Sequence, residues 1–326
     1  MKKILLFDTS VATLNMGDEV IMNSIKNNMA DFLENTYCIS MPTHTLNYSK
    51  IQSLLSPKTL NEYKNVDYKF VCGTNLLYTN MLRPIPGWNI KITNTEIVKD
   101  SVLLGVGHGV NSKKVTLYTK LLYNRVLSKK YYHSTRDEKT KIMLENMGFK
   151  AINTGCPTLW GLTDSHCKDI PKEKSNSVIF TLTSYKYAQD REKDKKMIDI
   201  LRKNYENIFF WPQAIQDLEY LKELNEDNGV KIVSPNLKNY EKILSLDIDY
   251  VGSRLHGGIF ALQNKKRAII LAIDYRAREM KKTYSIPCIE RDEVDSKLDN
   301  IINSNFETKI TGLDFELINK WLKQFK

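Results

Sequence analysis

Short apolar runs alternate with longer segments whose apolar residues recur at helical spacing, and this alternation constrains the fold more than any other feature. The first four runs are KKILLFD (residues 2–8), TYCIS (36–40), DYKFVCG (67–73) and SVLLGVG (101–107). Runs that are apolar throughout are typical of strands buried on both faces, as in a parallel sheet. We therefore expect repeated strand–helix crossovers and an α/β fold.

A polar stretch, KDIPKEKSNS at residues 168–177, interrupts the alternation, which then starts again. Five further runs follow it: SVIFTLT (177–183), NIFFW (207–211), VKIVS (230–234), DIDYVGS (247–253) and RAIILAID (267–274). A chain of 326 residues suits two domains of ordinary size. We predict two Rossmann-like domains, each a doubly wound parallel sheet, over residues 1–172 and 173–305, facing a central cleft. Residues 306–326 contain an amphipathic helix that is expected to pack back on the first domain.

The net charge of +10 is concentrated in the first half of the chain. Up to Lys172 there are 22 Lys and Arg against 14 Asp and Glu, and after it 26 against 24. A basic half can meet nucleic acid, anionic lipid headgroups or an anionic substrate, or can simply be a solvated surface. The chain has no recognisable nucleic-acid module and no basic ribbon interleaved with aromatic residues, so we expect no nucleic-acid partner.

Neither a membrane span nor a metal site is predicted. No run of 18 or more apolar residues occurs, and the N-terminal apolar stretch is too short for a signal peptide, which favours a cytoplasmic location. The five cysteines are scattered, without a CxxC pair or histidines at metal-ligand spacing, and are expected to be buried free thiols. They are Cys38, Cys72, Cys156, Cys167 and Cys288.

Three motifs follow predicted strands, at the end of the sheet where doubly wound folds bind ligands. The first is NMGDEVIMNSI at residues 15–25. Gly17 permits a tight turn or a close approach to the backbone, and a carboxylate such as Asp18 is favoured in a first helical turn. Gly17 and Asn15 are candidate substrate contacts, although either Asn15 or Asp18 can equally be a helix cap without further function.

The second motif, STRDEKTKIMLENMGF at residues 134–149, runs from a strand end into a helix. Arg136 precedes a helix N-terminus, where the potential is already positive, and this makes sense if an anion is bound there. A surface arginine is the alternative. His108 follows another predicted strand and is a candidate contact to an acceptor substrate.

The third motif, DYVGSRLHGG, places Arg254 and His256 at the end of a strand and the start of a helix. The surrounding glycines allow close approach of a ligand, and the helix N-terminus with Arg254 offers a site for phosphate or carboxylate. His256 can exchange a proton near neutral pH, although a structural histidine is the alternative. Arg276, after the next strand, is a further candidate contact to the donor. Tyr185 and Gln213 follow other strand ends of the second domain and are candidates to line the same cleft, with turn or cap roles as the equal alternative.

The order and spacing of NMGDEVI, STRDEKT, SRLHGGIFAL and RAIILAIDYRAREM resemble the polysaccharide pyruvyltransferase family over most of the chain. The resemblance implies a fold like that of GT-B glycosyltransferases, with phosphoenolpyruvate as the donor. It implies a pyruvate ketal formed across two hydroxyls of a sugar in a cell-surface glycan or its precursor. Neither a metal nor an organic cofactor is implied.

The same resemblance assigns roles to individual residues. Asp18 matches the family's acceptor-side carboxylate, whereas Arg136, Arg254, Leu255 and His256 match donor-side positions. We expect His256 to be the general acid or the partner of the leaving phosphate, and Asp18 to orient or deprotonate the attacking hydroxyl.

Two departures from the family pattern concern the acceptor side. The sequence CGTNLLY stands where a glycine-rich segment is common, and Thr158 stands where an aspartate is common. The basic first half suits a lipid-linked acceptor and peripheral contact with the inner membrane surface. Two alternatives are a GT-B glycosyltransferase using a nucleotide sugar and a non-catalytic binding protein for glycan assembly.

Overall fold

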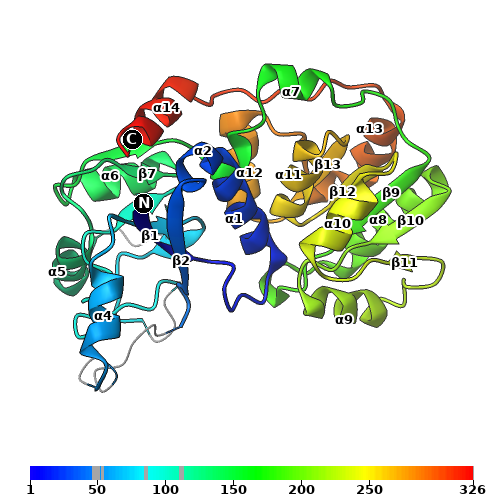
Figure 1. Cartoon of the computed structure of the whole chain (residues 1–326). Coiled ribbons are helices and arrows are strands. Elements are labelled where there is room, and N and C mark those ends of the chain that lie inside the picture. Colours follow the sequence, from blue (N-terminus) through cyan, green and yellow to red (C-terminus); the bar gives the residue numbers. More distant parts are fainter. Residues whose placement is uncertain (46–51, 53–54, 84–86, 110–113, 326) are drawn as a thin grey trace. The chain divides into compact units, whose positions relative to one another are not determined.

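The computed structural model describes residues 1–45, 52, 55–83, 87–109 and 114–325 (Figure 1). Its contacts divide the chain into two compact units. Unit 1 comprises Met1–Thr13, Ile21–Trp160 and Asp314–Lys326, and unit 2 comprises Leu14–Val20 and Gly161–Leu313. The α/β fold class with parallel sheets is confirmed, since every paired strand in both units runs parallel to its neighbour.

The unit boundaries differ from the predicted positions after residue 172 and at residue 306. Helix α7 (Asp164–Lys168) belongs to unit 2, where His166 Nε2 lies 2.8 Å from the Leu262 carbonyl oxygen. Residues up to Leu313 remain with the same unit, in which the Thr311 N–H donates to the Tyr284 carbonyl at 3.0 Å. These long-range contacts cannot be deduced from the polar composition of the predicted linker.

Unit 1 is built on a four-stranded parallel sheet of order β2-β1-β3-β5. Its strands are β1 (Lys2–Asp8), β2 (Thr36–Pro42), β3 (Tyr68–Cys72) and β5 (Val102–Leu104). Two small parallel pairs accompany the sheet, β4 (Asn75–Leu77) with β6 (Gly107–His108) and β7 (His133–Thr135) with β8 (Ala151–Asn153). The sequence predicted the first four strands and a strand end at Ser134, in β7, but not the other short strands or the two pairs, whose strands are only two or three residues long.

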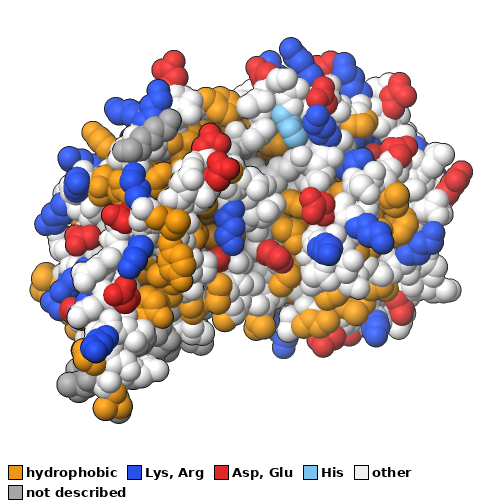
Figure 2. All heavy atoms as spheres, in the orientation of Figure 1, with side chains coloured by type: hydrophobic (Ala, Val, Ile, Leu, Met, Phe, Trp, Pro, Cys, Tyr) orange, Lys and Arg blue, Asp and Glu red, His pale blue; other side chains and the backbone are white. Residues whose placement is uncertain are grey.

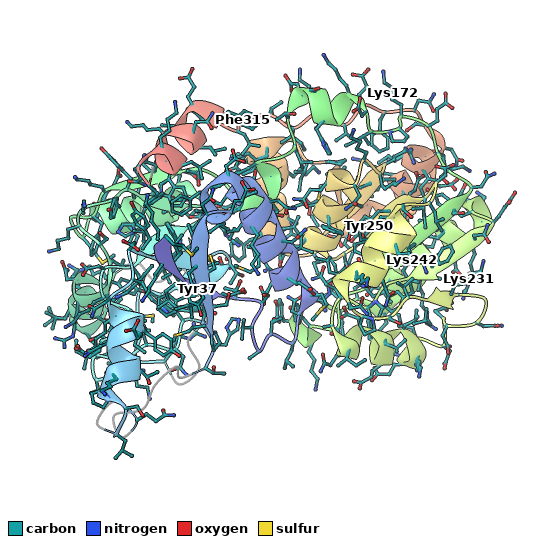
Figure 3. The ribbon with its side chains drawn as sticks, viewed as in Figure 1. Tyr37, Lys172, Lys231, Lys242, Tyr250 and Phe315 are labelled. Atoms are coloured by element: carbon teal, nitrogen blue, oxygen red, sulfur yellow. The ribbon has the colours of Figure 1, made fainter. Side chains whose placement is uncertain are left out.

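Strand β2 departs from the expectation that the strands are buried on both faces. Only Met41 is buried in it, and Tyr37 is 59% exposed (Figure 3). The reason is its place at the edge of the sheet, with β1 on one side only. Cys38 is exposed for the same reason, which corrects the prediction that all five free thiols are buried.

The helices of unit 1 cover the two faces of its sheet. They are α1 (Met16–Asn28), whose first turn belongs to unit 2, α2 (Ala30–Leu33), α4 (Pro57–Lys64), α5 (Leu117–Val126), α6 (Glu138–Glu145) and α14 (Phe315–Lys323). The C-terminal segment is part of this unit because Trp321 and Phe325 pack in one apolar cluster with Ile4 and Phe70. The rings of Phe70 and Phe325 are 4.8 Å apart, edge to face.

Unit 2 is built on a six-stranded parallel sheet of order β11-β10-β9-β12-β13-β14. Its strands are β9 (Ser177–Thr181), β10 (Asn207–Phe210), β11 (Lys231–Ile232), β12 (Asp249–Gly252), β13 (Ala268–Ala272) and β14 (Cys288–Glu290). Counted along the chain, the order is third, second, first, fourth, fifth, sixth, which is the doubly wound dinucleotide-binding topology. The order reverses between β9 and β12, so these two strands mark the switch point where such sheets bind ligands.

The main helices of unit 2 are α8 (Arg191–Asn204), α9 (Ile215–Glu223), α10 (Leu237–Leu244), α11 (Leu255–Gln263), α12 (Tyr275–Tyr284) and α13 (Asp299–Asn303). They bury an apolar core in which Val178, Phe180, Phe210 and Val251 of the sheet contact residues such as Ile198. Helix α11 is buried over nearly its whole surface, because it carries two glycines and apolar residues on all sides. No helix in the described part of the chain combines the length and apolar content needed to cross a membrane.

His133 at the start of β7 is fully buried and its two ring nitrogens both have partners. Nδ1 accepts from the Leu103 N–H at 3.1 Å, so Nε2 carries the proton and donates to the Ser128 carbonyl at 2.8 Å. Burial lowers the pKa of His133 from 6.5 to about 4, even though the Ser128 carbonyl favours the protonated ring.

We expect the free energy of unfolding to fall as the pH is lowered from 6.5 toward 4, because unfolded His133 takes up a proton that the folded residue refuses. The loss attributable to this residue is on the order of 3 kcal/mol. Urea unfolding between these limits should show a shallower pH dependence in His133→Gln, which keeps an amide donor but does not titrate. An identical pH dependence in both proteins would contradict the assignment.

Candidate functional site

A small pocket opens in unit 2 beside the switch point between β9 and β12. It is lined by Asn15, Thr183, Tyr185, Gln213, Ser253, Arg254, Leu255, His256, Ile273, Asp274, Arg276 and Ala277. All of these residues belong to unit 2, including Asn15, which lies in Leu14–Val20. The cavity volume is about 20 Å³, room for about one water molecule, so a larger ligand requires the side chains around it to move.

Arg254 is held in this pocket by a buried carboxylate. Its Nε donates to Asp217 Oδ2 at 2.9 Å and to the Leu182 carbonyl at 3.1 Å, and its Nη2 donates to Asp217 Oδ1. The Arg254 side chain is 3% exposed and that of Asp217 is 0% exposed. Each charge is therefore shielded from water and is stable in this position only because the other neutralises it. Burial alone would lower the pKa of Arg254, but Asp217 outweighs it and raises the pKa above its ordinary value.

Asp217 is itself fixed by two backbone donors, one in the segment after β9 and one at the N-cap of α9. The Ser184 N–H donates to Oδ1 and the Ala214 N–H to Oδ2, each at 3.0 Å. With the bidentate contact to Arg254, each carboxylate oxygen accepts more than one hydrogen bond. The guanidinium orientation is therefore set before any ligand arrives.

An aromatic side chain covers the guanidinium. The Tyr185 ring centre lies 4.5 Å from Arg254 Cζ, and Tyr187 stacks on Tyr185 at 5.6 Å between ring centres. The Tyr250 hydroxyl donates to the Arg254 carbonyl at 2.8 Å. The Arg254 guanidinium thus lies between the Asp217 carboxylate and the Tyr185 ring, at the end of β12.

The N-terminal motif contributes directly to this pocket. Asn15 Nδ2 donates to the Tyr185 hydroxyl at 3.3 Å, and Gln213 Nε2 donates to Asn15 Oδ1 at 2.7 Å. A Cβ atom on Gly17 would come within 2.8 Å of Gln213 Nε2, so a larger residue there would displace the amide that contacts Asn15. Asn15 therefore belongs with the predicted donor-side residues, whereas Asp18, in the first turn of α1, does not line the pocket.

The backbone around Arg254 is packed too tightly for side chains. A Cβ on Gly252 would lie 2.7 Å from the Thr181 backbone nitrogen, and one on Gly258 would lie 2.5 Å from Ile270 Cγ1. Because these two glycines have no side chains, the start of α11 can pack closely against the sheet. His256, in its first turn, is 7% exposed and lines the pocket with Leu255.

Helix α11 begins without a side-chain cap, since Arg254 occupies the N-cap position and makes no capping hydrogen bond. The first N–H groups of a helix have no intrahelical acceptor and carry positive potential. Arg254, His256 and Arg276 line the same pocket, so this pocket carries N–H groups of the kind that can donate to an anion.

Arg276 forms a second ion pair at the rim of the pocket. Asp274 caps α12 and accepts from Arg276 Nε at 2.9 Å and Nη2 at 2.6 Å. Burial alone would raise the pKa of Asp274, but Arg276 and the backbone donors lower it below its ordinary value. Each arginine thus has a carboxylate that neutralises part of its charge in the absence of an anionic ligand.

Arg136 and His108 meet in unit 1, at the ends of β7 and β6. Arg136 Nε lies 3.7 Å from Asp137 Oδ2, and His108 Nδ1 lies 3.0 Å from Thr140 Oγ1. Asp137 Oδ1 accepts from Thr140 Oγ1 at 2.7 Å and caps α6. Both predicted residues therefore belong to one cluster in unit 1, whereas Arg254, His256 and Arg276 belong to unit 2.

Four pocket or support residues were missed by sequence reasoning: Asp217, Asp274, Thr183 and Ser253. Asp217 and Asp274 read as ordinary first-turn or N-cap carboxylates. The useful signal was their position after strand ends of the second sheet, the same signal that singled out Tyr185 and Gln213. Their pairing with arginines depends on tertiary contacts.

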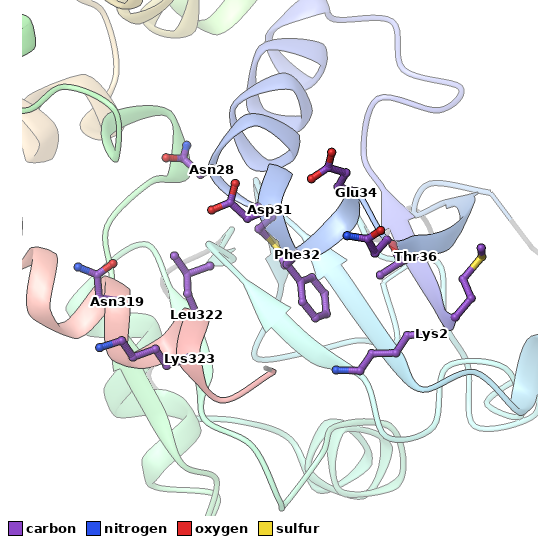
Figure 4. A pocket seen from close by; sticks show the side chains of 12 residues that line it. Lys2, Asn28, Asp31, Phe32, Glu34, Thr36, Asn319, Leu322 and Lys323 are labelled. Carbon is purple, nitrogen blue, oxygen red and sulfur yellow. The ribbon is translucent and has the colours of Figure 1, made fainter.

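A larger cavity in unit 1, of about 1020 Å³, contains none of the predicted site residues (Figure 4). Figure 4 shows Lys2 and Phe32 facing its interior, with Asp31, Glu34 and Lys323 around it. The mixture of both charges gives it no preference for an anion. Among the described residues, no group of His, Cys, Asp and Glu is arranged to hold a metal ion.

The chain matches the family model described as polysaccharide pyruvyl transferase over residues 15–275. The matched span includes Asn15, Arg136 and the Arg254–His256 stretch, and ends just before Arg276. No curated protein matches the chain.

Several solved structures show a distant likeness. UDP-GlcNAc 2-epimerases from Methanocaldococcus jannaschii, in complex with UDP-GlcNAc and UDP, and from Neisseria meningitidis, bound to UDP-GlcNAc, are 14% and 13% identical to the chain. Each alignment covers 99% of this chain and 100% of the other, with TM-scores of 0.49 and 0.47. The E. coli heptosyltransferase WaaC, with ADP-2-deoxy-2-fluoro heptose, is 13% identical over 82% of this chain and 88% of its own, with a TM-score of 0.39. The fold assignment rests on the strand orders of the two sheets rather than on these values.

Proposed function

Because the chain belongs to the polysaccharide pyruvyl transferase family, we propose that it transfers the enolpyruvyl-derived group of phosphoenolpyruvate to two hydroxyls of one sugar. The product is a pyruvate ketal on a cell-surface glycan or its precursor, and phosphate is released. The observation that carries this proposal is the switch-point pocket of unit 2, which is lined by Arg254, Arg276 and His256, the last in the first turn of a helix without a side-chain cap.

The pocket suits a small dianionic or trianionic donor. Phosphate and carboxylate each need several N–H donors, and the α11 amides, Arg254 and Arg276 supply them from neighbouring strand ends. When an anion enters, it shares these cations with Asp217 and Asp274. Tyr185, which lies over the Arg254 guanidinium, is the side chain whose movement would admit the donor.

The proposed reaction at this site begins with a proton transfer to the donor. His256 donates a proton to the methylene carbon of phosphoenolpyruvate, which leaves positive charge at C2. One sugar hydroxyl forms a C–O bond to C2 while its proton passes to Asp18 or to the now neutral His256. The bond between C2 and the phosphate oxygen breaks, and phosphate leaves toward the cationic groups. The second hydroxyl of the sugar then attacks C2 and closes the ketal ring as its proton passes to the released phosphate or another base.

The acceptor-side roles are assigned to Asp18 and His108. Asp18 is proposed to orient or deprotonate the attacking hydroxyl, and His108 to contact the acceptor in the cluster with Asp137. Arg136 keeps its proposed place beside the donor phosphate, although it belongs to unit 1. A lipid-linked sugar on the cytoplasmic side of the membrane is the proposed acceptor, because the basic excess lies in the first half of the chain.

Thermal unfolding of the protein with phosphoenolpyruvate, compared with uridine nucleotides, tests the donor. We expect phosphoenolpyruvate alone to raise the unfolding temperature, and Arg254→Lys to weaken the effect about tenfold or more in apparent affinity, because a point charge cannot replace the bidentate fork. Stabilisation by a uridine nucleotide instead would favour a glycosyltransferase that uses a nucleotide sugar. Donor binding without phosphate release in the presence of glycan acceptors would favour a non-catalytic binding protein.

A further inference from the structure

The outer face of α5 carries apolar side chains where a surface helix normally carries polar ones. Leu117 is 73% exposed and Leu121 is 56% exposed. They are four residues apart and therefore lie on the same face, opposite the buried Leu122 and Val126. This leucine pair contributes nothing to the core of unit 1.

A cavity of about 670 Å³ opens beside this face, with walls from α5, α6 and the residues that precede α5. Lys114, Lys120 and Lys139 line it, and all three are exposed. Its apolar lining comes from Val115, Ile142, Met143 and Met147. Lysines around an apolar floor suit a ligand that joins an anionic group to a hydrocarbon body.

The charge around the cavity has one sign. Between residues 114 and 147 the sequence contains eight Lys and Arg against three Asp and Glu, so this tenth of the chain carries half of the net charge of +10. One of the carboxylates, Glu138, is already paired with Lys141 at 2.8 Å. In Figure 2, Lys and Arg side chains lie among apolar ones on the part of unit 1 that carries α5 and α6 in Figure 1.

We propose that this α5–α6 face, formed by Lys114, Leu117, Lys120, Leu121, Lys139 and Ile142, docks unit 1 on an anionic phospholipid bilayer. The cavity would receive a lipid phosphate, held by its three lysines. Leu117 and Leu121 would enter the boundary between headgroups and acyl chains, as the apolar faces of interfacial helices do. Lysine ammonium groups at such a surface remain partly hydrated while they attract anionic lipid.

Exposed leucines favour a bilayer over a free phosphate as the source of the ligand. A soluble phosphate compound would be bound by the lysines alone. It would leave the two leucines in water, where exposed apolar surface is unfavourable. Both features are explained if the phosphate is attached to a lipid. His108, the proposed acceptor contact, also lines this cavity. Vesicle binding requires neither the donor nor the chemistry at His256, so it is measured separately from the proposed reaction.

Flotation with vesicles of phosphatidylcholine, alone or mixed with phosphatidylglycerol, tests the proposal with the full chain. The protein should bind only the anionic vesicles, and binding should weaken as salt is added. Replacing Lys114, Lys120 and Lys139 together by Gln should weaken binding about a hundredfold, since each lysine contributes about fivefold near such a surface. Leu117→Ser with Leu121→Ser should weaken it at least about tenfold.

Matched control variants come from exposed residues of unit 2. Lys222, Lys238 and Lys242 are exposed on α9 and α10, and Ile232 and Leu246 are 45% and 48% exposed. Their replacement by Gln and Ser should leave vesicle binding unchanged, and unaltered thermal unfolding would show that all variants are folded.

Three results would each overturn the proposal. The first is a wild-type protein that does not bind anionic vesicles, or binds neutral ones equally well. The second is equal losses in the unit 2 controls. The third is full competition by soluble glycerol phosphate with no effect of the leucine variants, which would assign the cavity to a soluble phosphate compound.

Discussion

Replacing His256 by Ala should lower turnover by about 10²–10⁴-fold while the protein stays folded, because it removes the proposed proton donor. The side chain lines the pocket of unit 2 without being part of its core, so its truncation leaves the apolar cluster of that unit intact. The measurement is phosphate release from phosphoenolpyruvate in the presence of a glycan acceptor. Thermal unfolding of the variant with the donor shows whether binding is retained.

The split between turnover and donor binding is decisive for His256. A general acid acts in the transition state, so its loss should lower kcat more than it raises KM. His166 is a matched control, since it is also a histidine of unit 2 near a helix and bonds to the Leu262 carbonyl at 2.8 Å. A His256 variant with near-normal kcat, or an equal loss in His166→Ala, would rule out the proposed role.

Replacing Asp217 by Asn should destabilise unit 2 by about 3–5 kcal/mol, because it leaves the Arg254 charge buried without a carboxylate. Arg254 is 3% exposed and cannot reach water without a rearrangement of Tyr185 and the chain after β9. Equilibrium unfolding in urea measures this loss. The same substitution should also abolish the stabilisation by phosphoenolpyruvate, since the guanidinium loses its fixed orientation.

A second buried pair separates these two effects. Arg267 Nη1 and Asp249 Oδ2 lie 2.9 Å apart, with side chains 0% and 3% exposed, and neither residue lines the pocket. Asp249→Asn should therefore reduce stability without changing the response to the donor, at concentrations of urea where both variants are folded. If Asp217→Asn binds the donor normally, Asp217 does not position Arg254 for it.

The sequence predicted the strands that lie inside the two sheets more accurately than those at the edges. Lys2–Asp8 was predicted to the residue, and the predicted 247–253 contains Asp249–Gly252. Both strands have neighbours on two sides, which enforces a continuous apolar run. Thr36–Pro42 and Lys231–Ile232 lie at edges, where exposure of one side permits polar residues, and the expected burial was wrong there.

For the site, placement after strand ends was the informative signal. Arg254, His256 and Arg276 were selected by this signal, and the structure shows that they line one pocket. Tyr185 and Gln213 were selected in the same way and line it too. It could not show that Asn15 joins that pocket through Gln213, because this contact links positions 198 residues apart. Nor could it identify Asp217 as the partner of Arg254, since a carboxylate at the start of a helix has a sufficient local explanation as a cap.

The glycines around Arg254 also limit how this site can change by mutation. A single nucleotide change turns a glycine codon into one for alanine, yet at Gly252 the new methyl group would meet the Thr181 backbone at 2.7 Å, and at Gly258 it would meet Ile270 at 2.5 Å. Overpacking of this kind typically costs about 1–3 kcal/mol, and a neighbouring strand has little freedom to retreat. Gly252 and Gly258 are therefore closed to substitution, so changes in what this pocket binds would have to arise at its lining side chains, such as Asn15, Tyr185 and Gln213.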